Sequence, residues 1–316
     1  MHVPDGFIDL KTAVAASTLA VAGVGIALRQ VKKNLPARRI PLLGLGAAFT
    51  FAAQMVNFPV IGGTSGHLVG GTLIATLLGL PAAVIVMTTV LIAQCFLFAD
   101  GGVTALGVNI FNMAIVAPLV GFGVFRVIHR LLPSLRGKLT AVAFAGWCST
   151  VIASIACAGQ LAWSGTVSWS AALPAMAGIH MLIGLGEGVI SALVFFAVVK
   201  ARPEIIDAAP AESTTGFVGY SLLATLGVAA FVAPFACPWP DGLDAVADKL
   251  GFAHAAQSSV AAPLTDYAIP GIHSPALATA IAGVVGAIVV FGLALLLSRL
   301  LVKNQPPEAN NNLTHA

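Results

Sequence analysis

Long apolar segments recur from one end of the chain to the other, and they constrain its fold more than any other feature. Apolar residues make up 58% of the 316 residues and charged residues only 9%, with a mean hydropathy of +0.97. A water-soluble domain carries about 25% charged residues, so this chain lacks the polar side chains to cover itself in water. The apolar runs are continuous and reach the length of about 20 residues that a helix needs to cross a bilayer, whereas a β-barrel would show short alternating segments. They therefore predict an all-α integral membrane protein.

We expect nine helices, which are split by a polar linker into a seven-helix bundle and a two-helix appendix. The predicted domains are the bundle over 1–200, a cytoplasmic linker over 201–216, an appendix over 217–303 with an outer loop at 237–274, and a cytoplasmic tail over 304–316. Gly79-Leu80-Pro81 is a helix stop followed by a restart, and it separates the third helix from the fourth. The predicted helices cover residues 10–30, 40–57, 66–80, 82–99, 103–128, 139–162, 174–199, 217–236 and 275–301.

The basic residues predict that the N-terminus lies outside the cell. With nine crossings and the N-terminus outside, all of the 15 Lys and Arg residues except Lys11 and Lys249 fall on inner segments, as the positive-inside rule requires. Met1, the loop around His67, the turn at Asp100 and the 237–274 segment then share the outer face. The inner residues are Arg29, Lys32, Lys33, Arg38, Arg39, Arg126, Arg130, Arg136, Lys138, Lys200, Arg202, Arg299 and Lys303.

The first two residues form a potential metal chelate. Because His2 is bulky, the initiator methionine should be retained, and Met1 keeps a free amine. The Met1 amine, the His2 backbone nitrogen and His2 Nδ1 can close a five-membered and a six-membered ring on one ion. Square-planar nitrogen ligation with an ionised amide suits Ni²⁺ or Cu²⁺ best, and it leaves one in-plane position open.

A second histidine on the same face could complete this set. His67 follows Gly62-Gly63-Thr64-Ser65-Gly66, where glycines let backbone segments approach closely. An alternative stays open, in which His2 is merely exposed and His67 hydrogen-bonds a neighbouring carbonyl. The metal ligands that we predict are Met1, His2 and His67.

Several polar residues at or near membrane depth are expected to orient these histidines rather than bind the ion, since ionisable groups in a membrane usually face the bundle interior. For Asp100 the alternative is a helix cap, and for Asn109 and Asn112 it is hydrogen bonding between helices. The candidates for the orienting role are Ser65, Asp100, Asn109, His180 and Glu187, with Gln54, Asn57, Gln94 and Asn112 in the wider set.

These motifs resemble one family. Met1-His2-Val3-Pro4-Asp5-Gly6-Phe7 is similar to the opening of the substrate-binding membrane component of nickel/cobalt energy-coupling-factor transporters, the CbiM/NikM family. The segment from Gly63 to Leu68, the run from Phe98 to Asn109 and Gly184-Leu185-Gly186-Glu187-Gly188 resemble further motifs of that family. The resemblance covers most of residues 1–200.

The predicted outer loop at 237–274 contains a motif that resembles a different, smaller component. Pro240-Asp241-Gly242-Leu243-Asp244 is similar to the signature of the PDGLE-type, NikN/CbiN-like accessory domain, with Asp244 in place of glutamate. Asp241 and Asp244 could suggest a metal site, but we favour a turn followed by an amphipathic helix.

The resemblance implies a component of an ATP-driven importer in the bacterial cytoplasmic membrane. Ni²⁺ (or Co²⁺ for cobalamin synthesis) would be held as transported substrate by Met1, His2 and His67, with no organic cofactor. The implied partners are a transmembrane coupling subunit, cytoplasmic ATPase subunits and membrane lipid, and no nucleic acid. A phosphate loop of the GxxxxGK[ST] type is absent from the sequence, so ATP hydrolysis is expected on other subunits.

Two functions of other classes remain as alternatives. An intramembrane metalloenzyme would need an HExxH-type pair, which His180-Met181-Leu182 is not. A secondary metal transporter that works without an ATPase usually has related halves, and none are visible. Transport in the absence of ATPase partners would distinguish such a carrier from an importer component.

Overall fold

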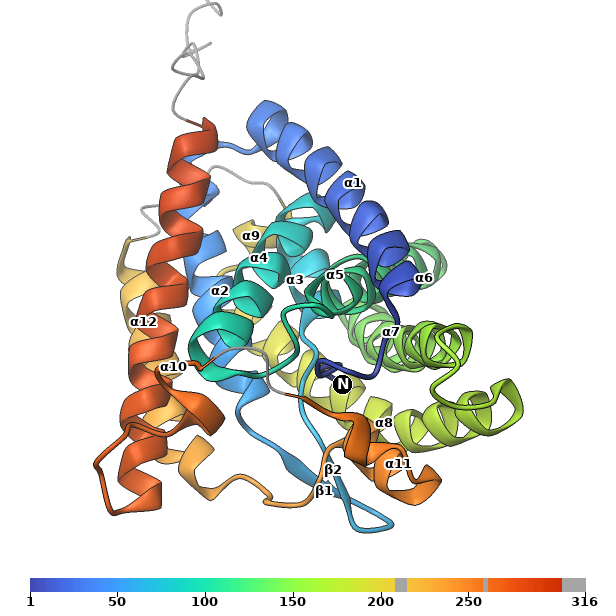
Figure 1. Ribbon diagram of the computed structural model, residues 1–316. Coiled ribbons are helices and arrows are strands. Elements are labelled where there is room, and N and C mark those ends of the chain that lie inside the picture. The colour runs from blue at the N-terminus through green and yellow to red at the C-terminus, as the bar shows by residue number, and fades with distance from the viewer. Residues whose placement is uncertain (208–214, 258–260, 303–316) are drawn as a thin grey trace, which may run out of the picture.

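The computed structural model describes residues 1–207, 215–257 and 261–302 and is almost entirely helical (Figure 1). Part of the predicted linker and the whole predicted tail, 304–316, lie outside these residues. The long helices are α1 (Leu10–Asn34), α2 (Ile40–Gln54), α4 (Leu80–Ala93), α6 (Ala117–Leu131), α7 (Leu135–Trp163), α8 (Trp169–Ala201), α10 (Thr215–Phe231) and α12 (Pro275–Val302). The shorter ones are α3 (Gly71–Leu78), α5 (Leu106–Asn109), α9 (Glu204–Asp207) and α11 (Gly242–Leu250).

Seven spans in the described residues are long and apolar enough to cross a membrane: 10–34, 80–98, 106–131, 135–163, 169–201, 216–235 and 275–302. All nine predicted helices are present, but α2 has 15 residues and α3 has 8. At about 1.5 Å per residue, neither reaches the hydrocarbon thickness of about 30 Å. The predicted membrane-spanning, all-helical architecture is confirmed, with two helices shorter than the apolar runs that contain them.

The predicted start of the third helix at residue 66 is wrong. Thr64–Gly66 forms strand β2, which pairs antiparallel with β1 (Phe58–Val60). Gly70 has a φ of 83°, which is left-handed backbone and incompatible with a continuing helix, so α3 begins only at Gly71. His67 therefore lies in an irregular segment between a strand and a helix.

Two stretches of π-helix interrupt the long central helices. One, η2 (Gln94–Phe98), ends α4, and the other, η3 (Ile110–Val116), joins α5 to α6. Turns of π-helix are rare in proteins, and those that occur are often found at functional sites. Here they flank the turn at Asp100 and direct Gln94 and Asn109 into the protein interior, where both are buried.

The appendix packs against the bundle through an apolar core. Residues of α2, α4 and α12, among them Phe51, Val90 and Val290, belong to one cluster of buried side chains. The contact is close enough that a Cβ on Gly286 would lie 2.2 Å from Phe51 Cζ. The two parts of the chain thus share one core at membrane depth.

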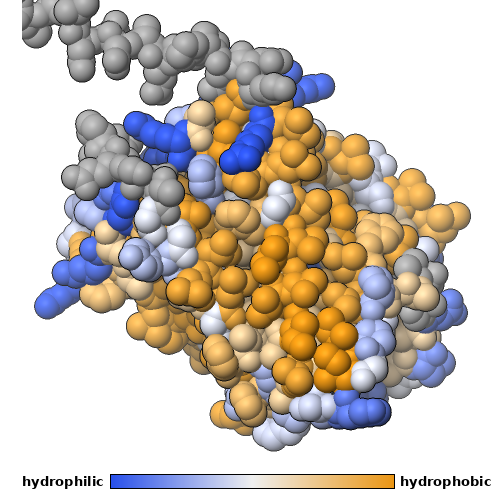
Figure 2. Space-filling view, turned by 90° about the vertical axis from the view of Figure 1, so that its left-hand side faces the viewer, coloured by the Kyte–Doolittle hydropathy of each residue, from blue (hydrophilic) through white to orange (hydrophobic). Residues whose placement is uncertain are grey.

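The surface and the helix ends agree with a membrane protein. Figure 2 shows a broad hydrophobic face with hydrophilic residues at its margins. Leu223 on α10 and Leu277, Ile288 and Leu296 on α12 are each more than half exposed. In Figure 1 the C-terminal ends of α1 and α12 lie at one end of the molecule, and the β-hairpin and α11 lie at the other.

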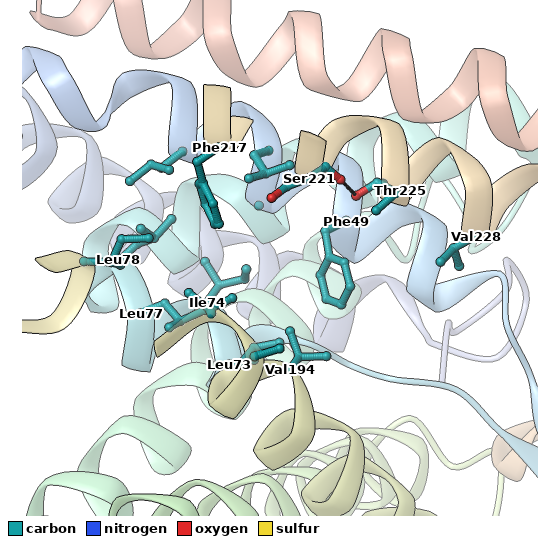
Figure 3. A pocket seen from close by; sticks show the side chains of 17 residues that line it. Phe49, Leu73, Ile74, Leu77, Leu78, Val194, Phe217, Ser221, Thr225 and Val228 are labelled. Atoms are coloured by element: carbon teal, nitrogen blue, oxygen red, sulfur yellow. Dashed lines mark hydrogen bonds between the residues drawn. The ribbon is translucent and has the colours of Figure 1, made fainter. Parts of the chain in front are cut away.

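An apolar cavity of about 300 Å³ lies between α10 and the bundle (Figure 3). Phe49, Leu73, Val194 and Phe217 contribute to it from α2, α3, α8 and α10. Nearly all of its lining is hydrocarbon, so it offers no ligands to a metal ion.

Candidate metal centre

The first seven residues run without helix into the centre of the bundle, where the chain end lies in Figure 1. Met1 is 4% exposed and Val3 is fully buried. Asn109 on α5 holds both backbone groups of Val3, because its Oδ1 accepts from the Val3 N–H at 2.8 Å and its Nδ2 donates to the Val3 carbonyl at 3.0 Å. Asn109 therefore hydrogen-bonds the residue after His2. It bonds neither a predicted metal ligand nor another helix, which was the alternative interpretation.

Further contacts hold the rest of this segment. The Asp5 carboxylate accepts hydrogen bonds from the Thr104 N–H at 2.8 Å and from its hydroxyl at 2.6 Å. The Gly102 N–H donates to the Val3 carbonyl, and a Cβ on Gly102 would lie 2.2 Å from the Asp5 nitrogen. This explains physically why the chain needs glycine at that turn.

Three groups with nitrogen donors converge at the chain end. The Met1 amine nitrogen lies 3.3 Å from His67 Nε2. The rings of His2 and His67 are stacked, with centroids 5.5 Å apart and an interplanar angle of 21°. The three residues predicted as ligands are thus neighbours, although they come from the N-terminus and from the segment after β2.

His67 presents Nε2 to this cluster because its other nitrogen is engaged. His67 Nδ1 lies 3.2 Å from the Leu68 carbonyl oxygen, which can only accept, so Nδ1 carries the proton. Burial, with the Met1 amine and His2 adding to it, lowers the pKa of His67 to about 3. The ring is therefore neutral near pH 7, with a lone pair on Nε2.

Glu187 on α8 fixes the backbone that follows His67. Its carboxylate accepts from the Val69 N–H at 2.6 Å and from the Gly70 N–H at 3.1 Å. Glu187 is fully buried, so these bonds provide the partners that a buried carboxylate requires. It acts on His67 through the main chain, as a residue that orients the histidine would.

Asp100 and Gln94 face the two nitrogens of the His2 ring. Asp100 Oδ1 lies 3.2 Å from Nδ1, and Gln94 Oε1 lies 3.2 Å from Nε2. Asp100 also accepts a hydrogen bond from the Tyr267 hydroxyl at 2.5 Å, and it makes no helix cap. Burial lowers the pKa of His2 below its ordinary value, although Asp100 opposes this effect.

The prediction that favoured a purely structural Asp241 is incomplete. Asp241 does cap α11, because its Oδ1 accepts from Leu243 N and Asp244 N. Its Oδ2, however, lies 2.5 Å from the Met1 amine. The missed signal was the Pro-Asp-Gly repetition: Asp5 and Asp241 each follow a proline, and the two segments meet at the chain end.

The contact between the Met1 amine and the Asp241 carboxylate shifts the pKa of both groups. Burial alone would lower the pKa of the Met1 amine, but the Asp241 carboxylate opposes this and holds that pKa above its ordinary value of 8.0. Burial would likewise raise the pKa of Asp241, and the amine and His67 hold it well below its usual range. The metal-free site therefore contains an ammonium–carboxylate pair near pH 7.

Ser65 and His180 connect to the Asp241 segment and not to the histidine pair. Ser65 Oγ donates to the Trp239 carbonyl at 2.8 Å, and Ser65 N donates to the Pro240 carbonyl at 2.8 Å. His180 Nδ1 bonds the Met176 carbonyl at 2.8 Å, and its ring packs against Gly242. Asn112 is further away and pairs with Gln160 on α7, which is the bonding between helices that we had considered.

An acidic cavity of about 460 Å³ opens beside the histidines. Its lining contains no lysine or arginine, and its carboxylates come from both parts of the chain. Burial and Asp241 raise the pKa of Asp244 to about 6. The four acidic residues are Asp100, Asp241, Asp244 and Asp266.

The family model described as "Cobalt uptake substrate-specific transmembrane region" (CbiM) matches residues 2–205. The chain belongs to the CbiM family. A second model, described as "PDGLE domain", matches residues 215–303. Both resemblances noted in the sequence are thereby confirmed.

Relatives extend over the whole chain. A putative fused nickel transport protein NikMN of Archaeoglobus fulgidus is 36% identical over 303 residues, which are 95% of this chain and 98% of that protein. A putative cobalt transport protein CbiM of Methanococcus voltae is 31% identical and covers 66% of this chain and 95% of its own length. A crystal structure described as a truncated transition metal transporter matches 64% of this chain and 99% of its own with 33% identity and a TM-score of 0.59.

Family membership and the seven apolar spans make this CbiM-family chain a multi-pass membrane protein. Its relatives are named as metal transport proteins, and the chain is a transport component and not an enzyme. No group of three or more His, Cys, Asp or Glu side chains in the described part of the chain has the geometry to hold a metal.

Proposed function

We propose that this protein captures Ni²⁺ at its N-terminus as the substrate-binding component of an ATP-driven importer. The ligands are the Met1 amine, the His2 backbone nitrogen, His2 Nδ1 and His67 Nε2. The observation that carries the proposal is the approach of the Met1 amine to His67 Nε2, at 3.3 Å. With metal–nitrogen bonds of about 2.0 Å, neighbouring in-plane nitrogens lie about 2.8 Å apart, so a small closure would bring both onto one ion.

The choice of nickel rests on the donor set. Four nitrogens that include an ionised backbone amide favour a square-planar ion, and Ni²⁺ ranks above Co²⁺ in affinity for such donors. The names of the Archaeoglobus fulgidus and Rhodobacter capsulatus relatives, both nickel transport proteins, also support nickel. Cobalt is the second candidate, supported by the name of the Methanococcus voltae relative.

The acidic cavity supports a role in collecting the cation. Carboxylates of one sign in a cleft with low-dielectric walls raise the local concentration of cations. We propose that the cavity faces the outside of the cell, as the basic residues predict, and that Asp241 holds the Met1 amine until the ion arrives. On the inner face, the basic segments would meet a coupling subunit and paired ATPases.

Metal binding to the purified protein tests the chelate. Native protein should bind about one Ni²⁺ per chain with the yellow absorption band of a square-planar complex. Extending the chain by one residue before Met1 should abolish this band, because the amine no longer adjoins His2, and His67→Ala should weaken binding. Equal binding by the extended protein would refute the N-terminal chelate.

Transport assays test the importer. Vesicles that contain this chain alone should accumulate almost no Ni²⁺, and uptake should require the coupling and ATPase subunits together with ATP. Uptake by the chain alone, driven by an ion gradient, would instead make it a secondary carrier.

A further inference from the structure

Two buried glutamines connect the His2 ring to the main chain beyond His67. His2 Nε2 lies 3.2 Å from Gln94 Oε1, Gln94 Nε2 lies 2.8 Å from Gln54 Oε1, and Gln54 Nε2 lies 2.9 Å from the Val69 carbonyl oxygen. Gln54 is 5% exposed and Gln94 is fully buried. The sequence placed both in the wider set expected to orient the histidines, without saying what either would do.

The direction of this chain of hydrogen bonds is fixed at its far end. A carbonyl oxygen accepts and never donates, so Gln54 must turn its amide N–H toward Val69. Its own oxygen then faces Gln94, which must answer with an N–H. The Gln94 oxygen is left facing His2. Because an amide oxygen only accepts hydrogen bonds, His2 Nε2 must carry a proton.

We propose that Gln54 and Gln94 are positioning residues that hold the His2 proton on Nε2 and so reserve Nδ1 for the metal. The inference rests on the proposed chelate, in which Nδ1 is the only ring nitrogen of His2 that can close the six-membered ring. His67 is held in the opposite tautomer by the Leu68 carbonyl. The site therefore prepares one ring of each tautomer, and each directs its lone pair to the ion.

Asp100 completes this arrangement on the other edge of the ring. It lies 3.2 Å from His2 Nδ1, where either a proton or the ion would meet a carboxylate. In the metal-free protein Asp100 therefore competes with the glutamines for the His2 proton, whereas an ion at Nδ1 satisfies both contacts.

The test measures the tautomer directly in the metal-free protein. Nitrogen-15 NMR of labelled histidine should show His2 with a protonated Nε2 and a bare Nδ1 in its neutral form. Gln94→Met, which keeps the side-chain length but offers no acceptor, should populate the Nδ1–H form as well. Its Ni²⁺ affinity should fall by about 10- to 100-fold, as is usual when a partner of a metal-bound histidine is lost.

Three further variants make the test specific. Gln94→Glu keeps an oxygen toward Nε2 and should keep the native tautomer, and Gln54→Met should shift it less than Gln94→Met, because it leaves the Gln94 oxygen in place beside Nε2. Gln160→Met is the matched control, since it removes an amide pair with Asn112 on α7 away from the site. It should change neither the His2 tautomer nor the affinity.

Three results would overturn the proposal: a native His2 with its proton on Nδ1, a Gln94→Met protein with native tautomer and affinity, or a loss of affinity with an unchanged tautomer. The last would leave Gln94 with a merely structural role. Failure of the proposed function looks different, because an N-terminal extension that leaves Ni²⁺ binding intact refutes the chelate without altering the tautomer of the metal-free protein.

Discussion

At the residue scale, the site is a balance of charges around the chain end. The Met1 amine needs its lone pair to bind a metal, yet Asp241 stabilises its protonated form. Metal binding must therefore release this proton, and affinity is linked to pH. The same carboxylate that draws cations toward the site also competes with them for the amine.

This competition predicts the pH dependence of Ni²⁺ binding. The Met1 amine must lose its proton to bind the ion, so it adds to the rise of Ni²⁺ affinity with pH until the pH exceeds its pKa in the metal-free protein. That pKa lies above 8.0, and the His2 backbone amide must lose a proton as well, so the affinity should still be rising at pH 8. Asp241→Asn removes the attraction of the carboxylate for the Met1 ammonium and leaves burial, which lowers the pKa of the amine. The midpoint, which is the pH at which half of the protein binds Ni²⁺ at a fixed Ni²⁺ concentration, should therefore move to a lower value.

Titrations of the two proteins with Ni²⁺ across a range of pH would measure the midpoint. Asp248→Asn, an exposed carboxylate on the same helix α11, is the control and should behave as the native protein. A midpoint that stays in place or moves upward in Asp241→Asn would show that Asp241 does not hold the ammonium form.

Glu187 provides a second prediction at this scale. Glu187→Gln keeps the shape but replaces one acceptor oxygen by an NH₂ group, which then faces the N–H of Val69 or Gly70. Losing one of these charge-assisted bonds should displace the His67 segment and weaken Ni²⁺ binding by about tenfold. Isothermal titration would measure the Ni²⁺ affinity. Glu204→Gln, which removes the distant ion pair with Arg202, is the control. Unchanged affinity would mean that the Val69 backbone is held by other contacts.

At the scale of elements, the sequence predicted the long helices well and the short irregular pieces poorly. An apolar run specifies a helix by its length, and α7 and α12 lie within four residues of their predicted limits, whereas α8 begins five residues early. The β-hairpin and the late start of α3 depend on a left-handed Gly70 and on pairing with β1, neither of which leaves a periodic signal. Sequence reasoning therefore fails at the segment that carries His67.

The site itself was predicted in part, and for a chemical reason. Met1, His2 and His67 bear the donor atoms, so residue type alone indicated them. Asp241 and Tyr267 contribute through contacts between segments more than 160 residues apart, which no local pattern encodes. Ser65 and His180, which we predicted to orient the histidines, contact the Asp241 segment instead.

The docking of α11 on α8 gives a prediction at this scale. A Cβ on Gly242 would lie 2.7 Å from Ile183 Cδ1 and 2.9 Å from His180 Cε1, so Gly242→Ala should push α11 away and separate Asp241 from Met1. We expect a lower thermal midpoint and a lower pH midpoint for Ni²⁺ binding. Ile183→Val, which removes the nearest atom, should restore part of both.

Gly219→Ala on α10 is the matched control, because a Cβ there has no neighbour within 4 Å. If Gly242→Ala behaves like this control, α11 has room to adjust, and the close packing around Gly242 does not set the position of Asp241.

At the scale of the whole molecule, two parts that match two separate family models line one acidic cavity. The bundle provides His2 and His67, and the appendix provides Asp241 and Tyr267. Their contact consists of an apolar core at membrane depth and polar contacts near the metal site.

This arrangement predicts that the two parts associate even when the link is cut. Separately expressed chains that end at residue 207 and start at residue 208 should co-purify in detergent and bind Ni²⁺ with the pH dependence of the intact protein. Gly286→Leu should separate them, because even a Cβ there lies 2.2 Å from Phe51 Cζ, and helix pairs in membranes rely on such small residues for close approach. Gly292→Leu lies on the same helix with no neighbour within 4 Å, so it should leave the pair intact and control for the added apolar bulk.

Two outcomes would contradict this account. If the two chains fail to co-purify without any substitution, the linker is required for assembly, because the shared core is too weak to hold the appendix. If the Gly286→Leu protein co-purifies like the Gly292→Leu protein, the contact between α12 and α2 does not join the two parts.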